Sequence, residues 1–176
     1  MIFITGIKDN KQCYQIKYVL DIGLFRQLKS FNYVYPNVTT VINNPDILLA
    51  IYLDSLFMPV KQLNIMWNRA MSTYITKDYK EILLRMGKEN GEKGVEFNLI
   101  VESTNENEKY FKSIRNCNVR FLDNIVENIQ LCDNRVCVRP FLDEGDDNLA
   151  YIVWSNFQPL INQKQQLFDS LWKMSN

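Results

Sequence analysis

Four aromatic or cationic side chains fall at or near the ends of expected strands, where a protein built of alternating strands and helices can bind a ligand. They are Trp67, Arg120, Tyr151 and Trp154. In open α/β sheets the ligand lies beyond the carboxyl ends of the strands, usually in a partly apolar cleft. An arginine there can hold an anion, and a tryptophan can stack on a flat group. We take these four as the candidate ligand site, and the alternative is that they are core aromatics and a surface arginine.

Histidine is absent from all 176 residues. Without it the chain cannot assemble a Ser-His-Asp or Cys-His catalytic group, or a metal site with histidine ligands. We therefore expect no catalytic residue, and a protein that works by binding.

Two further groups could in principle hold a metal. The acidic loop 143–147 could ligate a hard cation, but its glycine comes too early for a calcium loop and no glutamate follows at the right distance. A solvated loop is the better interpretation. The four cysteines lie among apolar neighbours and are expected to be free buried thiols, with a disulfide or a metal pair as the alternative: Cys13, Cys117, Cys132 and Cys137. We expect neither a metal nor a cofactor.

The charge balance limits the partners. Twenty basic and twenty acidic residues cancel, and no Lys/Arg cluster provides the electrostatic footprint of nucleic-acid binding. We expect no direct contact with nucleic acid. The start of the chain has no signal-peptide pattern, and the most apolar window, 47–60, is too short for a membrane span and contains Asp54. These features favour a cytoplasmic protein with one domain of ordinary size.

The hydrophobic pattern predicts alternating strands and helices. Expected strands cover 2–5, 38–42, 60–66, 95–101, 119–122, 129–131, 136–141 and 150–154, with weaker candidates at 24–28 and 33–35. Expected helices cover 9–20, 45–57 with Asn44 as cap, 76–88 with Thr76 as cap, a helix after Ser103 in a capping box with Glu106, and a closing helix. Alternation of this kind predicts an α/β fold with a mixed, largely parallel sheet flanked by helices. The pair of strands around Asp133-Asn134 adds an antiparallel hairpin.

The last 23 residues predict the closing helix. Ser155 or Asn156 can cap it, and Pro159 falls in its first turn, where a missing N–H costs nothing. Apolar residues recur at the spacing of a helix with one buried face.

The first residues contain a weak repeat of a later segment. Residues 3–14 follow the pattern of residues 99–110, and Phe25-Arg-Gln-Leu28 matches Val119-Arg-Phe-Leu122. One explanation is that two strand–helix–strand units look alike in any case. The other is that residues 1–37 are an extension resembling the second half of a repeated domain, placed before an α/β domain at 38–176.

Four stretches from Thr40 onward follow a recognisable pattern. Three are Gly94-Val-Glu-Phe-Asn-Leu-Ile-Val101, Asn105-Glu-Asn107 with Tyr110, and Val119-Arg-Phe-Leu-Asp123. The most specific is Trp154-Ser-Asn with Gln163-Lys-Gln-Gln-Leu-Phe-Asp-Ser-Leu-Trp172. In these stretches the chain resembles the phospholipase D-like sensory domain of archaeal signalling proteins, including TrmB-type transcriptional regulators and thaumarchaeal sensor histidine kinases. A catalytic phospholipase D half-site needs His-x-Lys-x4-Asp with histidine as nucleophile, and this chain has no histidine.

The resemblance implies a non-catalytic sensory domain of an archaeal signal-transduction or transcription-regulation system. A small molecule or a partner protein would bias its conformation or its homodimerisation, and a separate kinase or helix-turn-helix module would read the change. The alternative is a structural or protein-interaction subunit of a larger assembly.

Overall fold

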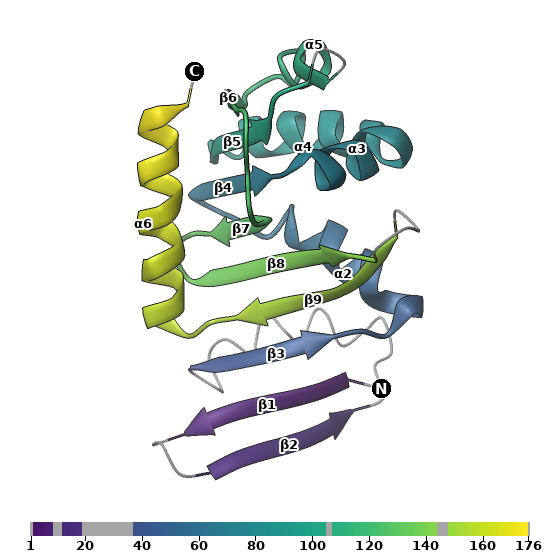
Figure 1. The fold of residues 1–176 in the computed structure, drawn as a ribbon, viewed down its shortest axis with the longest axis vertical. Coiled ribbons are helices and arrows are strands. Elements are labelled where there is room, and N and C mark those ends of the chain that lie inside the picture. Colours follow the sequence, from purple (N-terminus) through teal and green to yellow (C-terminus); the bar gives the residue numbers. More distant parts are fainter. Residues whose placement is uncertain (1, 9–11, 19–36, 105–106, 144–147, 176) are drawn as a thin grey trace.

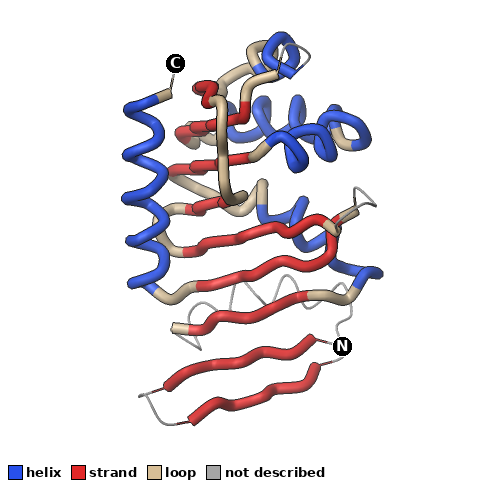
Figure 2. Tube along the Cα trace, viewed as in Figure 1, coloured by secondary structure: helices blue, strands red, loops and turns tan. Residues whose placement is uncertain are grey.

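The computed structural model describes residues 2–8, 12–18, 37–104, 107–143 and 148–175. Within them one mixed sheet of nine strands has the order β2-β1-β3-β9-β8-β7-β4-β5-β6 (Figures 1 and 2). The strands are β1 (Ile2–Lys8), β2 (Gln12–Tyr18), β3 (Val38–Ile42), β4 (Gln62–Trp67), β5 (Glu96–Glu102), β6 (Asn118–Leu122), β7 (Ile129–Cys132), β8 (Val136–Leu142) and β9 (Leu149–Ser155). The helices are α2 (Pro45–Ser55), α3 (Arg69–Asp78), α4 (Lys80–Glu92), α5 (Asn107–Phe111) and α6 (Gln158–Met174).

The expected fold class is confirmed: a mixed α/β sheet is flanked by helices, and a long C-terminal helix closes it. The parallel share of the sheet is smaller than expected. Only β4–β5 and β5–β6 pair in parallel, and the other described pairings are antiparallel. A parallel pair needs a long crossover, which the helices between β4 and β6 supply, whereas β7, β8 and β9 follow one another through short antiparallel connections.

The two faces of the sheet are covered differently. One face carries α2, α3, α4 and α5 over the larger core, which includes Leu63, Ile65 and Trp67 of β4. The other face carries α6 over a smaller core, which includes Met66 of β4 and Ile100 of β5. Figure 1 shows α6 on the near side at one end of the strands, with α2 behind the sheet. Alternate residues of one strand therefore contribute to opposite layers.

A ladder of asparagine side chains crosses the parallel strands on the α6 side. Asn64, Asn98 and Asn118 lie opposite one another in β4, β5 and β6. The Asn118 amide donates to Asn98 Oδ1 at 2.9 Å, and the Asn98 amide donates to Asn64 Oδ1 at 3.0 Å. The Asn64 amide in turn donates to Gln165 of α6 at 3.2 Å. The two buried amides of the ladder, Asn64 and Asn98, are thus hydrogen-bonded, as buried polar groups must be.

Some local predictions are wrong. Residues 12–18 form strand β2, paired with β1 along its whole length, where a helix over 9–20 was expected. Pairing with a neighbouring strand overrides the helical spacing of Cys13 and Ile16. The strand–helix–strand repeat therefore does not exist in this form. The weaker strand candidates at 24–28 and 33–35 lie outside the described residues.

Two helix starts also differ from expectation. Thr76 lies inside α3, which begins at Arg69 after the cap Asn68, and a break at Tyr79 separates α3 from α4. At α6 the cap position is Phe157, because Asn156 Oδ1 instead accepts the Val38 N–H of β3 at 2.6 Å. The expected cap at Asn44 is confirmed, with its Oδ1 accepting the Asp46 N–H at 3.0 Å and Pro45 in the first turn.

The described part of residues 1–37 continues the sheet, since β1 pairs antiparallel with β3. The domain boundary after residue 37 stays a prediction. In the described ranges no helix is long and apolar enough to cross a membrane.

Candidate polar site at the ends of strands β4 and β5

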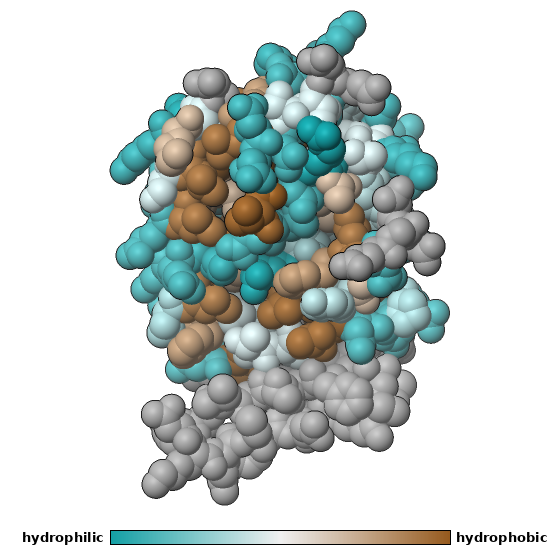
Figure 3. All heavy atoms as spheres, in the orientation of Figure 1, coloured by the Kyte–Doolittle hydropathy of each residue, from teal (hydrophilic) through white to brown (hydrophobic). Residues whose placement is uncertain are grey.

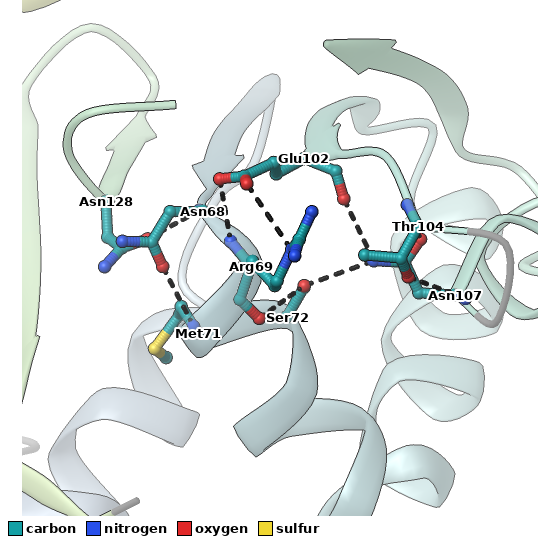
Figure 4. A network of polar contacts seen from close by, with 8 residues as sticks. All are labelled: Asn68, Arg69, Met71, Ser72, Glu102, Thr104, Asn107 and Asn128. Carbon is teal, nitrogen blue, oxygen red and sulfur yellow. Dashed lines mark hydrogen bonds and ion pairs between the residues drawn. The ribbon is translucent and has the colours of Figure 1, made fainter. Parts of the chain in front are cut away.

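Polar side chains gather where the parallel strands β4 and β5 end. Trp67, the last residue of β4, lies opposite Val101, and Glu102 follows it as the last residue of β5. Asn68 comes directly after β4 and caps α3. Figure 4 shows Asn68 and Glu102 close to Arg69, the first residue of α3. This edge of an α/β sheet is where ligands commonly bind.

Glu102 places a negative charge at the N-terminus of α3. Its Oε2 accepts the Arg69 N–H at 3.1 Å, and its Oε1 lies 3.6 Å from Arg69 Nε. The Glu102 side chain is 15% exposed and that of Arg69 is 66% exposed. A carboxylate at this position complements the positive end of the helix dipole. Glu102 therefore provides a hydrogen-bond acceptor for a free N–H group of the first turn of α3.

Two asparagines fix the same helix start. Asn68 Oδ1 accepts the Met71 N–H at 2.9 Å, the usual bond of a helix cap. The backbone N–H of Asn68 donates to Asn128 Oδ1 at 2.8 Å. Asn128 comes from the segment before β7, 60 positions along the chain, so this contact joins two separate parts of the fold.

Asn107, at the start of α5, completes the network. Its amide donates to the Glu102 carbonyl at 3.0 Å and to Ser72 Oγ at 3.3 Å. Its Oδ1 accepts the Thr104 N–H at 3.0 Å, while Thr104 Oγ1 accepts the Asn107 N–H at 3.2 Å. The reciprocal capping expected for Ser103 and Glu106 is thus seen one position later, and Glu106 lies outside the described residues.

The strand-end network contains groups of several polar kinds. It combines one carboxylate, one guanidinium, three amides and two hydroxyls, which together can donate to and accept from a polar ligand. The Ser72 hydroxyl donates to the Arg69 carbonyl at 2.9 Å, so no base is placed to take its proton. In the part of the chain that the structure describes, no group of three or more Asp, Glu or Cys side chains is placed to hold a metal ion.

The structure does not bring together the four residues expected to bind a ligand. Trp67 and Trp154 are 0% and 1% exposed and belong to the larger core. The Trp67 Nε1–H donates to Tyr52 Oη at 2.9 Å. Trp154 Nε1 has no hydrogen-bond partner among the described residues. For the two tryptophans, the interpretation as core aromatics describes the structure better.

Arg120 and Tyr151 lie on the α6 side of the sheet. The Arg120 guanidinium donates to the carbonyl of Trp172 at 2.6 Å and stacks over its ring, with 4.6 Å between Cζ and the ring centroid. It therefore holds the C-terminal end of α6, where unpaired carbonyls favour a cation. Tyr151 is 36% exposed and stacks on Phe141 of β8, with ring centroids 4.5 Å apart.

The cysteines whose side chains are described are free thiols, as expected: Cys117, Cys132 and Cys137. Burial raises the pKa of the Cys132 and Cys137 thiols to about 12. A thiol with such a pKa stays protonated near neutral pH and is a weak nucleophile. Cys132 and Cys137 belong to the buried core, and Cys117 packs against it partly buried. Of the acidic loop, residues 144–147 lie outside the described residues.

The sequence contains a signal for the residues that were missed. Asn68 directly follows the largely buried strand β4, and Glu102 ends the largely buried strand β5. Aromatic and cationic residues are the more familiar ligand-binding types at strand ends, whereas amides and a carboxylate there are equally typical of helix caps. Asn107 and Asn128 carry no local signal, because their partners are distant in the sequence.

No family model and no curated protein sequence matches the chain. Solved structures are similar in fold. TrmBL2, an archaeal chromatin protein reported to show a novel mode of DNA binding, superposes with a TM-score of 0.56 at 11% identity. The match covers 88% of this chain and 59% of TrmBL2, so the chain spans little more than half of that protein.

Two phospholipase D-type proteins match over nearly their whole length. Nuc, a phospholipase D family member from Salmonella typhimurium, gives a TM-score of 0.60 at 12% identity, over 80% of this chain and 97% of Nuc. NucT from Helicobacter pylori gives 0.59 at 10% identity, over 78% of this chain and 96% of NucT. At such low identity these likenesses carry no information on activity. They show that the chain has a phospholipase D-like fold.

Proposed function

We propose that the chain is a non-catalytic ligand-binding domain of an archaeal signal-transduction or transcription-regulation system, and that the strand-end network is its binding site. The observation that carries the proposal is the gathering of Glu102, Arg69 and three asparagines at the carboxyl ends of β4 and β5. The archaeal setting is suggested by the TrmBL2 likeness.

The chemistry of the network supports a polar, uncharged or zwitterionic ligand. Glu102 offers a carboxylate and Arg69 an exposed guanidinium, and the two already neutralise each other at 3.6 Å. A ligand with both hydroxyl or amino donors and oxygen acceptors can replace these internal contacts one for one. A simple anion would be repelled by the negative charge of Glu102.

The absence of catalysis is part of the proposal. The phospholipase D reaction uses a histidine nucleophile, and the chain contains no histidine. The one hydroxyl in the network that is fully buried, on Ser72, is engaged with a carbonyl oxygen and an amide. Nothing in the network therefore activates a nucleophile in the way an esterase or nuclease requires.

Nucleic acid is not the proposed ligand of this domain. The formal net charge of the chain is zero, whereas DNA binding depends on neutralising several phosphates. In the proposed system a separate helix-turn-helix or kinase module carries the output, and this domain controls it through a change in conformation.

The test is thermal unfolding in the presence of small polyols, sugars, nucleosides and amino acids. A ligand at about 100 times its Kd should stabilise the fold by about 2.7 kcal/mol, which raises Tm by roughly 5–10 °C in a domain of this size. Glu102→Gln should remove this shift. Glu96→Gln is the matched control, because Glu96 begins the same strand and bonds Gln62 and Asn98 at the opposite end.

Two outcomes would count against the proposal. In one, no compound of these classes raises Tm. In the other, a compound raises Tm equally in wild type, Glu102→Gln and Glu96→Gln, which would place its site elsewhere.

A second candidate function is a protein-interaction subunit, favoured by apolar side chains on the α6 side of the sheet. Val41 of β3 is 41% exposed and lies opposite Val153 of β9, beside the stacked pair Phe141 and Tyr151. Figure 3 shows apolar side chains gathered among polar ones over this face. Exposed apolar patches of this kind mark interaction surfaces.

If this face pairs two copies of the chain, light scattering after size exclusion should give twice the 20.8 kDa of one chain. Tyr151→Lys should then return the protein to a monomer, because a buried unpaired charge opposes association. Val60→Lys serves as control, since Val60 is also exposed, at 65%, but lies in the connection before β4. A wild-type monomer at all concentrations would contradict the pairing.

A further inference from the structure

The segment between β6 and β7, residues 123–128, lies in the same layer as α6. Figure 1 shows it crossing in front of the parallel strands on its way from β6 to β7. Ile125 is 4% exposed and packs in the smaller core with Met66 and Ile161, while Val126 is 81% exposed. Ile125 therefore anchors the segment on the sheet. The last two residues of the segment contact α6, β8 and the start of α3.

The last residue of the segment belongs to the strand-end network. Asn128 Oδ1 accepts the backbone N–H of Asn68 at 2.8 Å, and Asn68 caps α3 through the Met71 N–H. A movement of Asn128 therefore weakens its hydrogen bond with Asn68, the cap residue of α3. Glu102 binds the same helix start, where its carboxylate accepts the Arg69 N–H.

The residue immediately before it is tied to α6. Glu127 Oε1 accepts a hydrogen bond from Lys164 Nζ at 2.6 Å, and its Oε2 lies 3.0 Å from an Arg139 guanidinium nitrogen of β8. The side chains of Lys164, Glu127 and Arg139 are only 13%, 17% and 27% exposed. A carboxylate shared by two shielded cations is held firmly, because removing one charge leaves the others poorly solvated.

The closing helix depends on such contacts. Of the residues in α6 only Ile161 and Phe168 are fully buried. Leu167, Leu171 and Trp172 are partly buried against the same core, and Gln165 adds a polar contact with Asn64 of β4. A helix with only two fully buried residues can shift slightly on its core when a polar contact changes, because local rearrangement costs less than global unfolding.

We propose that Glu127 and Asn128 couple the strand-end network to α6, so that a change at the cap of α3 alters the seating of the closing helix. The two residues are adjacent in the chain, so a displacement of the backbone at one of them also moves the other. Through this coupling, ligand binding at the strand-end network would change the position of α6, and this part of the inference rests on the proposed function. Coupling is reciprocal, so a change at α6 also reaches the cap.

The test is amide hydrogen exchange of the full chain without ligand, read residue by residue by NMR. Lys164→Met removes the α6 partner of Glu127 and should speed exchange of the Asn68 amide by about tenfold or more. In the reverse direction, Asn128→Ala should speed exchange in the middle of α6, around Phe168. If Lys164→Met does not fold, Glu127→Gln keeps the shape and weakens the same contacts.

Gln158→Ala is the matched control. It removes a different contact of α6, the bond from Gln158 to the Asn134 carbonyl at 3.3 Å, and leaves the segment 123–128 untouched. It should leave the Asn68 amide unchanged. The amide of Leu99, in the core of β5, reports global unfolding.

The coupling would be overturned if Lys164→Met left Asn68 exchange within about twofold of wild type, or if Gln158→Ala accelerated it as much. Equal acceleration at Leu99 would also overturn it, because the effect would then be a loss of global stability. Exchange is measured without ligand, so a failed ligand screen and a failed coupling test are distinguishable.

Discussion

Replacing Trp67 by alanine is expected to lower the free energy of unfolding by about 3–5 kcal/mol, the range for removing a fully buried aromatic side chain. Trp67 is 0% exposed and lies 6.2 Å from Phe111 between ring centroids. Its removal also leaves the hydroxyl of Tyr52 without its donor. Burial raises the pKa of that hydroxyl, so it stays neutral and needs a partner. Urea unfolding followed by circular dichroism measures the loss.

A double-mutant cycle separates the hydrogen bond from the packing. Trp67→Phe, Tyr52→Phe and the double variant should be non-additive by about 1 kcal/mol, because either single change leaves one buried polar group unpaired. The result also decides the role of Trp67. If Trp67→Ala left stability within about 1 kcal/mol of wild type but abolished a ligand-induced shift, Trp67 would belong to a binding site and not to the core.

The second large effect is expected at Asp133, in the turn between β7 and β8. Its carboxylate accepts the N–H groups of Val60, Lys61 and Gln62 at 3.0, 2.8 and 2.9 Å. These N–H groups belong to the connection that leads into β4. Asp133 therefore fixes the start of the strand that ends at the candidate site. Asp133→Ala should cost about 2–3 kcal/mol, through the lost charged hydrogen bonds.

Asn134→Ala provides the control for this prediction. Both residues have positive φ, 54° at Asp133 and 53° at Asn134, so alanine is strained at either position. Only Asp133 holds the three N–H groups. Thermal or urea unfolding should therefore show a larger loss for Asp133→Ala, and equal losses would mean that the turn conformation alone matters.

Local signals predicted much of the fold. Strand β3, the cap Asn44 with Pro45 and the Asp133-Asn134 turn could be read from a few neighbouring residues, because their causes are local. Strand β2 could not, since the spacing of its apolar residues suits a helix as well as a strand, and the pairing with β1 decides between them. The number of parallel strand pairs was overestimated, because the order of strands and helices along the chain does not show which strands are neighbours in the sheet.

A ligand site at the strand ends stays a prediction, and the residues named for it are not brought together by the structure. The sequence pointed to the carboxyl ends of the strands, where the network lies. It nominated Arg120, which proves to hold the last carbonyls of α6, and missed Asn128, whose partner Asn68 is far away in the chain. Contacts between distant segments leave no trace in the local pattern of a single sequence.

The asparagine ladder of β4, β5 and β6 has a consequence for how these strands align during folding. Sliding one strand by one residue would exchange the side chains that face the two cores, and this error is costly. Sliding by two residues keeps every side chain on its face, so the apolar pattern alone does not oppose it. Depending on its direction, such a slip of β5 along β4 would place Asn98 opposite Met66 or Asn64 opposite Ile100. One buried amide would then face an apolar neighbour, since Asn64 and Asn98 are only 2% and 6% exposed. The ladder thus distinguishes the native alignment from the one error that hydrophobicity tolerates.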